Sequence, residues 1–138
     1  MLPLTPQANR TIIVEVSLMN VQAFKQELGI EILIRQPVSG CTERSKRFFD
    51  KMKVHLSSYS RVALVYIGEP DWEFLTFVID VNGDAILLDG FSWGYHGEGP
   101  RGLQWLFGQM GWDIDESLLP PAHTEGMWLI FRDHVEGP

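Results

Sequence analysis

Six stretches of the chain have the apolar pattern of β-strands. Thr11–Leu18 (TIIVEVSL) is dense in β-branched residues, which suit the pleated, half-buried surface of a sheet. Arg61–Ile67 (RVALVYI) is a nearly continuous apolar run, and Gly68 and Pro70 interrupt the pattern directly after it. The predicted strands are Thr11–Leu18, Ile30–Arg35, Arg61–Ile67, Trp72–Val81, Asp84–Leu88 and Met127–Arg132.

Three further stretches have apolar residues at helical spacing. The clearest predicted helix is Thr42–Leu56, for which Thr42 or Ser39 can serve as the cap. Its apolar stripe consists of Phe48, Phe49, Met52 and Leu56. A shorter helix, with the stripe Val21, Phe24 and Leu28, lies between a favourable N-cap residue, Asn20, and a favourable terminator, Gly29. The third begins at Pro100, ends before Gly111 and has the stripe Leu103, Leu106, Phe107 and Met110.

The dipeptide Asn82-Gly83 separates two strand-like stretches and predicts a β-hairpin in which both residues have positive φ. The elements then follow in the order β-α-β-α-β-β-β-α-β. Because a hairpin requires antiparallel neighbours, we expect an α+β fold. This would be a single domain over residues 1–138, with loose ends at 1–10 and 133–138. Its core would be a mixed, mostly antiparallel sheet of about six strands with two or three helices packed on it.

The composition agrees with one soluble domain. The chain has 138 residues, of which 45% are hydrophobic and 21% charged. Its single cysteine, Cys41, has no partner for an internal disulfide, which favours a reducing compartment. The stretch before Arg10 lacks the features of a signal peptide, and no apolar run approaches the ~20 residues of a membrane span. We therefore expect a cytoplasmic protein with no membrane association.

The net charge of −7 conceals an uneven distribution. Residues 35–61 contain seven of the eleven Lys and Arg but only two of the eighteen Asp and Glu, so this segment carries +5 and the remainder −12. Arg44, Arg47 and Lys51 share one face of the second predicted helix. Three interpretations remain open: a patch for a phosphate backbone or an acidic partner, a solvated helix face, or self-association of basic and acidic patches.

Residues 89–105 (DGFSWGYHGEGPRGLQW) form a glycine-rich aromatic segment leading into the third predicted helix. Free N–H groups at a helix start bind anions, but the glycine spacing fits neither a Walker A loop nor a dinucleotide fingerprint. His96 and Glu98 are candidates for a general base and its partner, or simply polar loop residues. No nucleophile motif accompanies them. The candidate ligand-binding residues are Trp93, Tyr95, His96, Glu98 and Arg101.

Within this segment, residues 93–107 resemble a W-G-Y-G-G-x-G-P-x-x-L segment of a small uncharacterised prokaryotic family, a domain of unknown function. Trp93, Gly94, Tyr95, Gly97, Gly99, Pro100 and Leu103 match that pattern, and His96 replaces a glycine. The resemblance implies a strand-loop-helix unit in which Trp93 and Tyr95 pack under the turn. It implies no activity.

The remaining reactive and aromatic residues give weaker signals. Cys41 lies at a helix start beside basic residues, where a thiol is either activated or inert. The four histidines lack the spacing of metal ligands, so no metal or other cofactor is predicted. Trp105 and Trp112 lie off the stripe of the third helix, and each either marks an exposed apolar patch or belongs to the core.

These observations lead to three hypotheses of function. The first is a non-enzymatic binding or interaction module that self-associates as a homodimer or binds another protein. The second is a small-ligand-binding protein or enzyme with its site at residues 89–105. The third is a nucleic-acid-binding accessory protein that uses the basic helix 42–56, which the −12 charge of the remainder disfavours.

Overall fold

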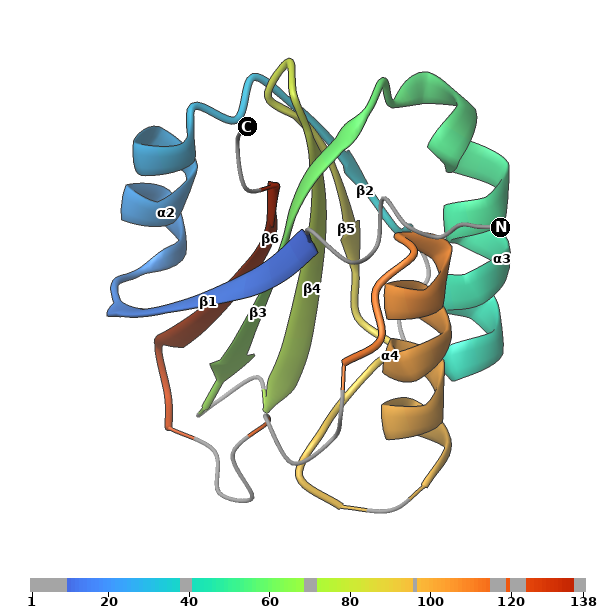
Figure 1. The fold of residues 1–138 in the computed structure, drawn as a ribbon. Coiled ribbons are helices and arrows are strands. Elements are labelled where there is room, and N and C mark those ends of the chain that lie inside the picture. Colours follow the sequence, from blue (N-terminus) through green and yellow to red (C-terminus); the bar gives the residue numbers. More distant parts are fainter. Residues whose placement is uncertain are drawn as a thin grey trace.

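The computed structural model describes residues 10–37, 41–68, 72–95, 97–114, 119 and 124–135. These residues form a six-stranded sheet in the order β1-β6-β3-β4-β5-β2 (Figure 1). The strands are β1 (Arg10–Leu18), β2 (Ile32–Arg35), β3 (Tyr59–Ile67), β4 (Glu73–Asp80), β5 (Asp84–Leu88) and β6 (Met127–Val135). The helices are α2 (Val21–Leu28), α3 (Thr42–Met52) and α4 (Glu98–Gln109), and a 3-10 turn, η1 (Lys53–His55), follows α3. Neighbouring strands are antiparallel except β2 and β5, which confirms the predicted α+β fold and its element order.

Both faces of the sheet are covered. α3 and α4 lie side by side on one face, and α2 lies on the other (Figure 1). Side chains alternate along β3, so Val62 and Leu64 join the core beneath α3 and α4, whereas Ala63 and Val65 join the core beneath α2. A central strand buried on both faces needs apolar residues at nearly every position, which explains its unbroken apolar run.

The α2 helix is fixed to the sheet by one aromatic stack. Asn20 is its N-cap and accepts a hydrogen bond from the Ala23 N–H at 2.8 Å, as predicted. Phe24 lies parallel to Trp128 of β6, with 3.6 Å between the ring centroids. The Trp128 indole N–H donates to the Met19 carbonyl oxygen at 2.8 Å, which ties the start of α2 to the same strand.

Several predicted boundaries are wrong: β2, β3 and α4 begin at Ile32, Tyr59 and Glu98 rather than at Ile30, Arg61 and Pro100. α3 ends at Met52 rather than Leu56, because the chain tightens into η1 and Leu56 reaches the core from an extended backbone. The N-cap of α3 is Cys41, without a side-chain hydrogen bond, and Thr42 instead donates to the Gly90 carbonyl oxygen at 3.0 Å; the other predicted cap, Ser39, lies outside the described residues. β6 continues past Arg132 to Val135, because its whole length is paired with β1.

The predicted hairpin joins β4 and β5, but its loop differs from the expected two-residue turn. Gly83 has a φ of +89°, whereas Asn82 does not have a positive φ. The loop is held by the buried Asp80 carboxylate, which accepts the N–H groups of Asn82 and Asp84, each at 2.9 Å. With Asp80 accepting these two hydrogen bonds, the loop between β4 and β5 is a three-residue turn that ends in glycine. In such a turn only the last residue, Gly83, needs the left-handed conformation.

Candidate functional site

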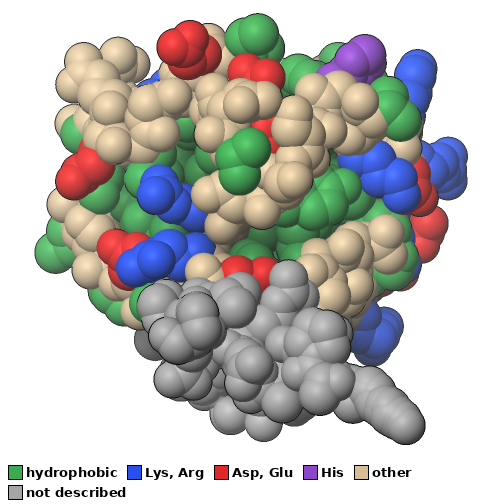
Figure 2. Space-filling model, turned by 45° about the horizontal axis from the view of Figure 1, so that its top comes forward, with side chains coloured by type: hydrophobic (Ala, Val, Ile, Leu, Met, Phe, Trp, Pro, Cys, Tyr) green, Lys and Arg blue, Asp and Glu red, His purple; other side chains and the backbone are tan. Residues whose placement is uncertain are grey.

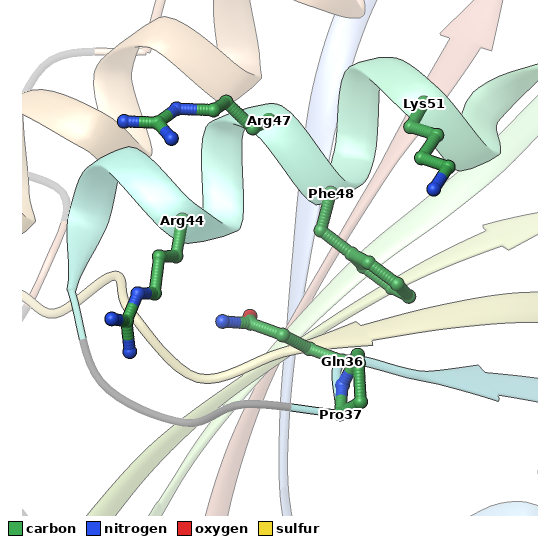
Figure 3. A pocket seen from close by; sticks show the side chains of 6 residues that line it. All are labelled: Gln36, Pro37, Arg44, Arg47, Phe48 and Lys51. Atoms are coloured by element: carbon green, nitrogen blue, oxygen red, sulfur yellow. The ribbon is translucent and has the colours of Figure 1, made fainter.

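The basic residues singled out in the sequence line one hollow beside α3. Its volume is about 370 Å³. Figure 3 shows Arg44, Phe48 and Lys51 extending from α3 toward the side where Gln36 and Pro37 lie, whereas Arg47 extends along the helix toward its N-terminal end. We call this the cationic hollow, and its lining consists of Gln36, Pro37, Arg44, Arg47, Phe48 and Lys51.

The helical repeat explains why these residues meet. Positions 44, 47, 48 and 51 are separated by three or four residues and therefore lie on one side of α3. Ser45 and Phe49 point into the protein and are fully buried. Figure 2 shows Lys and Arg side chains along the side of the molecule formed by α3, with some Asp and Glu side chains among them, and a second group of Lys and Arg side chains on the opposite side of the view. The basic residues of this face of α3 are therefore neighbours in space as well as in sequence.

Unlike the basic residues that line the hollow, two of their basic neighbours in α3 and η1 form ion pairs among the described residues. Lys46 lies 3.7 Å from Glu43 and over the Trp105 ring, and Lys53 lies 3.0 Å from Asp50. Within the described part of the chain, neither Arg44, Arg47 nor Lys51 forms an ion pair. Their charges therefore remain available to an anion that enters the hollow.

A buried polar cluster holds the wall of the hollow. The Gln36 side-chain oxygen accepts hydrogen bonds from the Ser45 hydroxyl at 2.7 Å and from the Asp89 N–H at 3.3 Å. Ser45 in turn accepts the Gly90 N–H at 2.9 Å. Sequence reasoning missed Gln36, because its role depends on contacts with residues 9 and 53 positions away.

The glycine-rich segment borders a second hollow, of about 390 Å³, which we call the loop hollow. It brings together two of the predicted ligand residues, Tyr95 and Glu98, with Asp89 and Cys41. The Tyr95 hydroxyl lies 2.7 Å from the Ser92 hydroxyl, and more than half of the Tyr95 side chain is exposed. The carboxylates of Asp89 and Glu98 line this hollow, and no Lys or Arg among the described residues does. The hollow is therefore unsuited to an anion bound at the N-terminal end of α4.

The other predicted residues of this segment do not line the loop hollow. Trp93 is buried, with its ring edge-on to Phe74 at 4.8 Å, whereas Tyr95, which the resemblance implies should pack beside it under the turn, is largely exposed. Arg101 is exposed on α4 outside the hollow, and His96 lies outside the described residues. No general base paired with Glu98 is therefore described at this site.

Several glycines of this segment are required by packing. A Cβ atom on Gly102 would lie 2.7 Å from the Phe91 ring and closer still to the Thr42 methyl group. A Cβ atom on Gly90 would meet the Ser45 hydroxyl at 2.5 Å. These two glycines let α4 and the loop approach the start of α3, so much of the motif serves the fold.

The two tryptophans that lie off the apolar stripe of α4 belong to packed parts of the structure. Of the two interpretations of Trp112, the structure supports the core position, because Trp112 is buried; the half-buried Trp105 packs edge-on against Phe49 at 5.9 Å. Cys41 is exposed, and His55 lies beyond the opposite end of α3. Burial raises the pKa of the Tyr59 hydroxyl above its ordinary value, but Tyr59 lines neither hollow.

Within the described residues, no group of three or more His, Cys, Asp or Glu side chains is placed to hold a metal ion. No helix of the described chain is long and apolar enough to cross a membrane. No family model, curated protein or solved structure matches the chain. The resemblance of residues 93–107 therefore stays a prediction.

Proposed function

We propose that the protein is a non-enzymatic binding module that recognises an acidic partner protein through the cationic hollow. One observation carries the proposal. Arg44, Arg47 and Lys51 line one hollow without an ion pair among the described residues, while neighbouring Lys46 and Lys53 are paired. Unpaired cations beside an apolar surface are available to a partner at little cost, because no internal salt bridge must first be broken.

The apolar part of the lining favours a protein over a nucleic acid. Phe48 and Pro37 contribute apolar surface between the cations, where an aromatic or aliphatic side chain of the partner would be buried. A nucleic acid would bind chiefly through its phosphates, and the −12 charge outside residues 35–61 opposes a long polyanion. We therefore expect an acidic segment that carries an apolar residue, and a second copy of this chain is one protein that could supply it.

Binding of a labelled acidic peptide tests the proposal. The probe is a fluorescein-labelled peptide in which phenylalanine alternates with pairs of glutamate. We expect saturable binding that weakens with salt, and about ten-fold weaker binding by the Arg44→Gln/Lys51→Gln variant, since two partly exposed charge pairs are lost. Fluorescence anisotropy at two salt concentrations measures both effects.

The control variant Lys53→Gln/Arg101→Gln removes the same charge outside the hollow and should bind like the unmodified protein. Equal loss in both variants would contradict a role for the hollow itself. Tighter binding of a single-stranded DNA oligonucleotide than of the peptide would contradict the assignment of a protein partner. Failure of the unmodified protein to bind the peptide would also count against the proposal.

A second candidate function is the binding of a small ligand in the loop hollow. The observation that favours it is the open space beside Tyr95 and Glu98, two residues that the sequence places in one motif. Asp89 and Glu98 give this hollow a charge opposite to that of the cationic hollow. The Glu98→Gln variant should weaken the binding of a ligand in the loop hollow and leave the affinity for the acidic peptide unchanged.

A further inference from the structure

A third hollow lies on the opposite face of the sheet, beside α2, and has a volume of about 220 Å³. α2 has eight residues and is therefore only about 12 Å long, whereas a six-stranded sheet is about 24 Å wide. The helix sits over part of its face (Figure 1), and the hollow is formed beside it by α2, β2, β3, β4 and β5. We call it the α2 hollow.

Core side chains form part of its lining. Leu75, Phe77 and Leu87 line the hollow and belong to the buried core beneath α2, each no more than 5% exposed. An apolar group that enters the hollow would therefore contact the core directly, without any element having to move.

Three charged side chains, one each from α2, β2 and β4, line the same hollow. Arg35 follows Leu33 by two positions on β2, and Glu73 precedes Leu75 by two on β4, so both share the inward face of their strands. Lys25 follows Val21 by one helical turn on the inner side of α2. The Arg35 and Glu73 side chains are 58% and 33% exposed and lie at strand ends, so their charged groups reach solvent at the rim of the hollow.

The charges of the α2 hollow are incompletely paired. Arg35 Nη2 and Glu73 Oε2 are 3.9 Å apart, which is too long for a hydrogen bond. Lys25 has no ion pair among the described residues. Lys25 and Arg35 together outweigh Glu73, so the charged groups of the hollow carry a net positive charge beside its apolar lining. Arg35 also has five N–H donors that can bind an anionic group.

From this arrangement we infer that the α2 hollow binds a short-chain monocarboxylate, with its carboxylate between Lys25 and Arg35 and its aliphatic tail against Leu75 and Leu87. The site is independent of the proposed function, because it lies on the other face of the sheet from α3. The hollow, of about 220 Å³, is smaller than typical ligand sites of ~300–1,000 Å³, which favours a short aliphatic chain over a long one.

Hexanoate, 1-hexanol and hexylamine distinguish this site from a merely apolar crevice, since their tails are the same and their head groups differ. Methyl ¹H–¹³C spectra of the full chain report on Leu33, Leu75 and Leu87, which line the hollow. We expect saturable shifts of these methyl signals with hexanoate, at an affinity at least ten-fold higher than that of 1-hexanol or hexylamine.

The variants Lys25→Gln and Arg35→Gln should each weaken hexanoate binding by about five-fold or more, whereas Arg101→Gln should not change it. Filling the space with Leu33→Trp should abolish the shifts, and a thermal melt confirms that each variant is folded. Equal affinity for hexanoate and 1-hexanol, absence of saturable shifts, or unchanged binding by both charge variants would overturn the inference. Because the acidic peptide probes α3 and hexanoate probes α2, failure of one site is distinguishable from failure of the other.

Discussion

Replacing Trp128 by alanine is expected to lower the free energy of unfolding by about 3–5 kcal/mol, a large part of the ~5–15 kcal/mol typical of a small domain. Trp128 is fully buried, and its ring is shared between Phe24 of α2, at 3.6 Å, and Phe77 of β4, at 5.5 Å. Truncation would leave a cavity between helix and sheet and remove the stack that holds α2. Urea denaturation followed by circular dichroism measures the change.

The variant Trp128→Phe separates the two contributions of this side chain. Phenylalanine keeps an aromatic ring against Phe24 but loses the indole N–H that donates to the Met19 carbonyl oxygen. We expect a loss of about 1–2 kcal/mol, most of it from the missing hydrogen bond and the smaller ring. If alanine proved no more destabilising than phenylalanine, the stack would not be what fixes α2 to the sheet.

Two glycine-to-alanine substitutions in α4 are expected to have opposite effects on stability. Gly102→Ala should destabilise the protein by about 2–3 kcal/mol, because its Cβ atom would overlap the Thr42 methyl group and the buried Phe91 ring. Gly108→Ala should stabilise it by up to about 1 kcal/mol, because Gly108 is exposed, has nothing within 4 Å of its Cβ position and lies in the same helix.

Since the two substitutions are chemically identical, helix propensity contributes about equally to both, and the difference between them measures the close approach of α4 to α3. Thermal melts of the two variants beside the unmodified protein give that difference directly. Stabilisation by Gly102→Ala would contradict a packing role for this glycine.

The role of the glycine-rich segment changes in light of these contacts. Its composition resembles that of ligand-binding loops, because glycine serves equally well where a backbone approaches a ligand or another part of the protein. Here Gly90 and Gly102 approach α3, and Trp93 fills the core beneath the turn. Tyr95 and Glu98 are left at the border of an open hollow. The sequence cannot distinguish these uses, because the approaching group comes from residues more than 40 positions away.

The pattern of the chain determined most of the fold. Strand and helix periodicity, the Asn20 cap and the Asn82-Gly83 turn are local signals, so they predicted the order of nine elements and a mixed sheet. The side of α3 that carries Arg44, Arg47 and Lys51 also followed from spacing alone.

Only the tertiary structure decided what surrounds those residues. Helical spacing placed the three cations and Phe48 together, but the facing wall of the hollow, Gln36 and Pro37, comes from the end of β2. Gln36 is held by Ser45 and by the Asp89 N–H of the loop after β5. The α2 hollow had no sequence signal, because Lys25, Arg35 and Glu73 belong to three elements that meet only when the sheet forms. Local signals follow from interactions between neighbours in the chain, whereas a binding site requires groups distant in sequence to be brought together by folding.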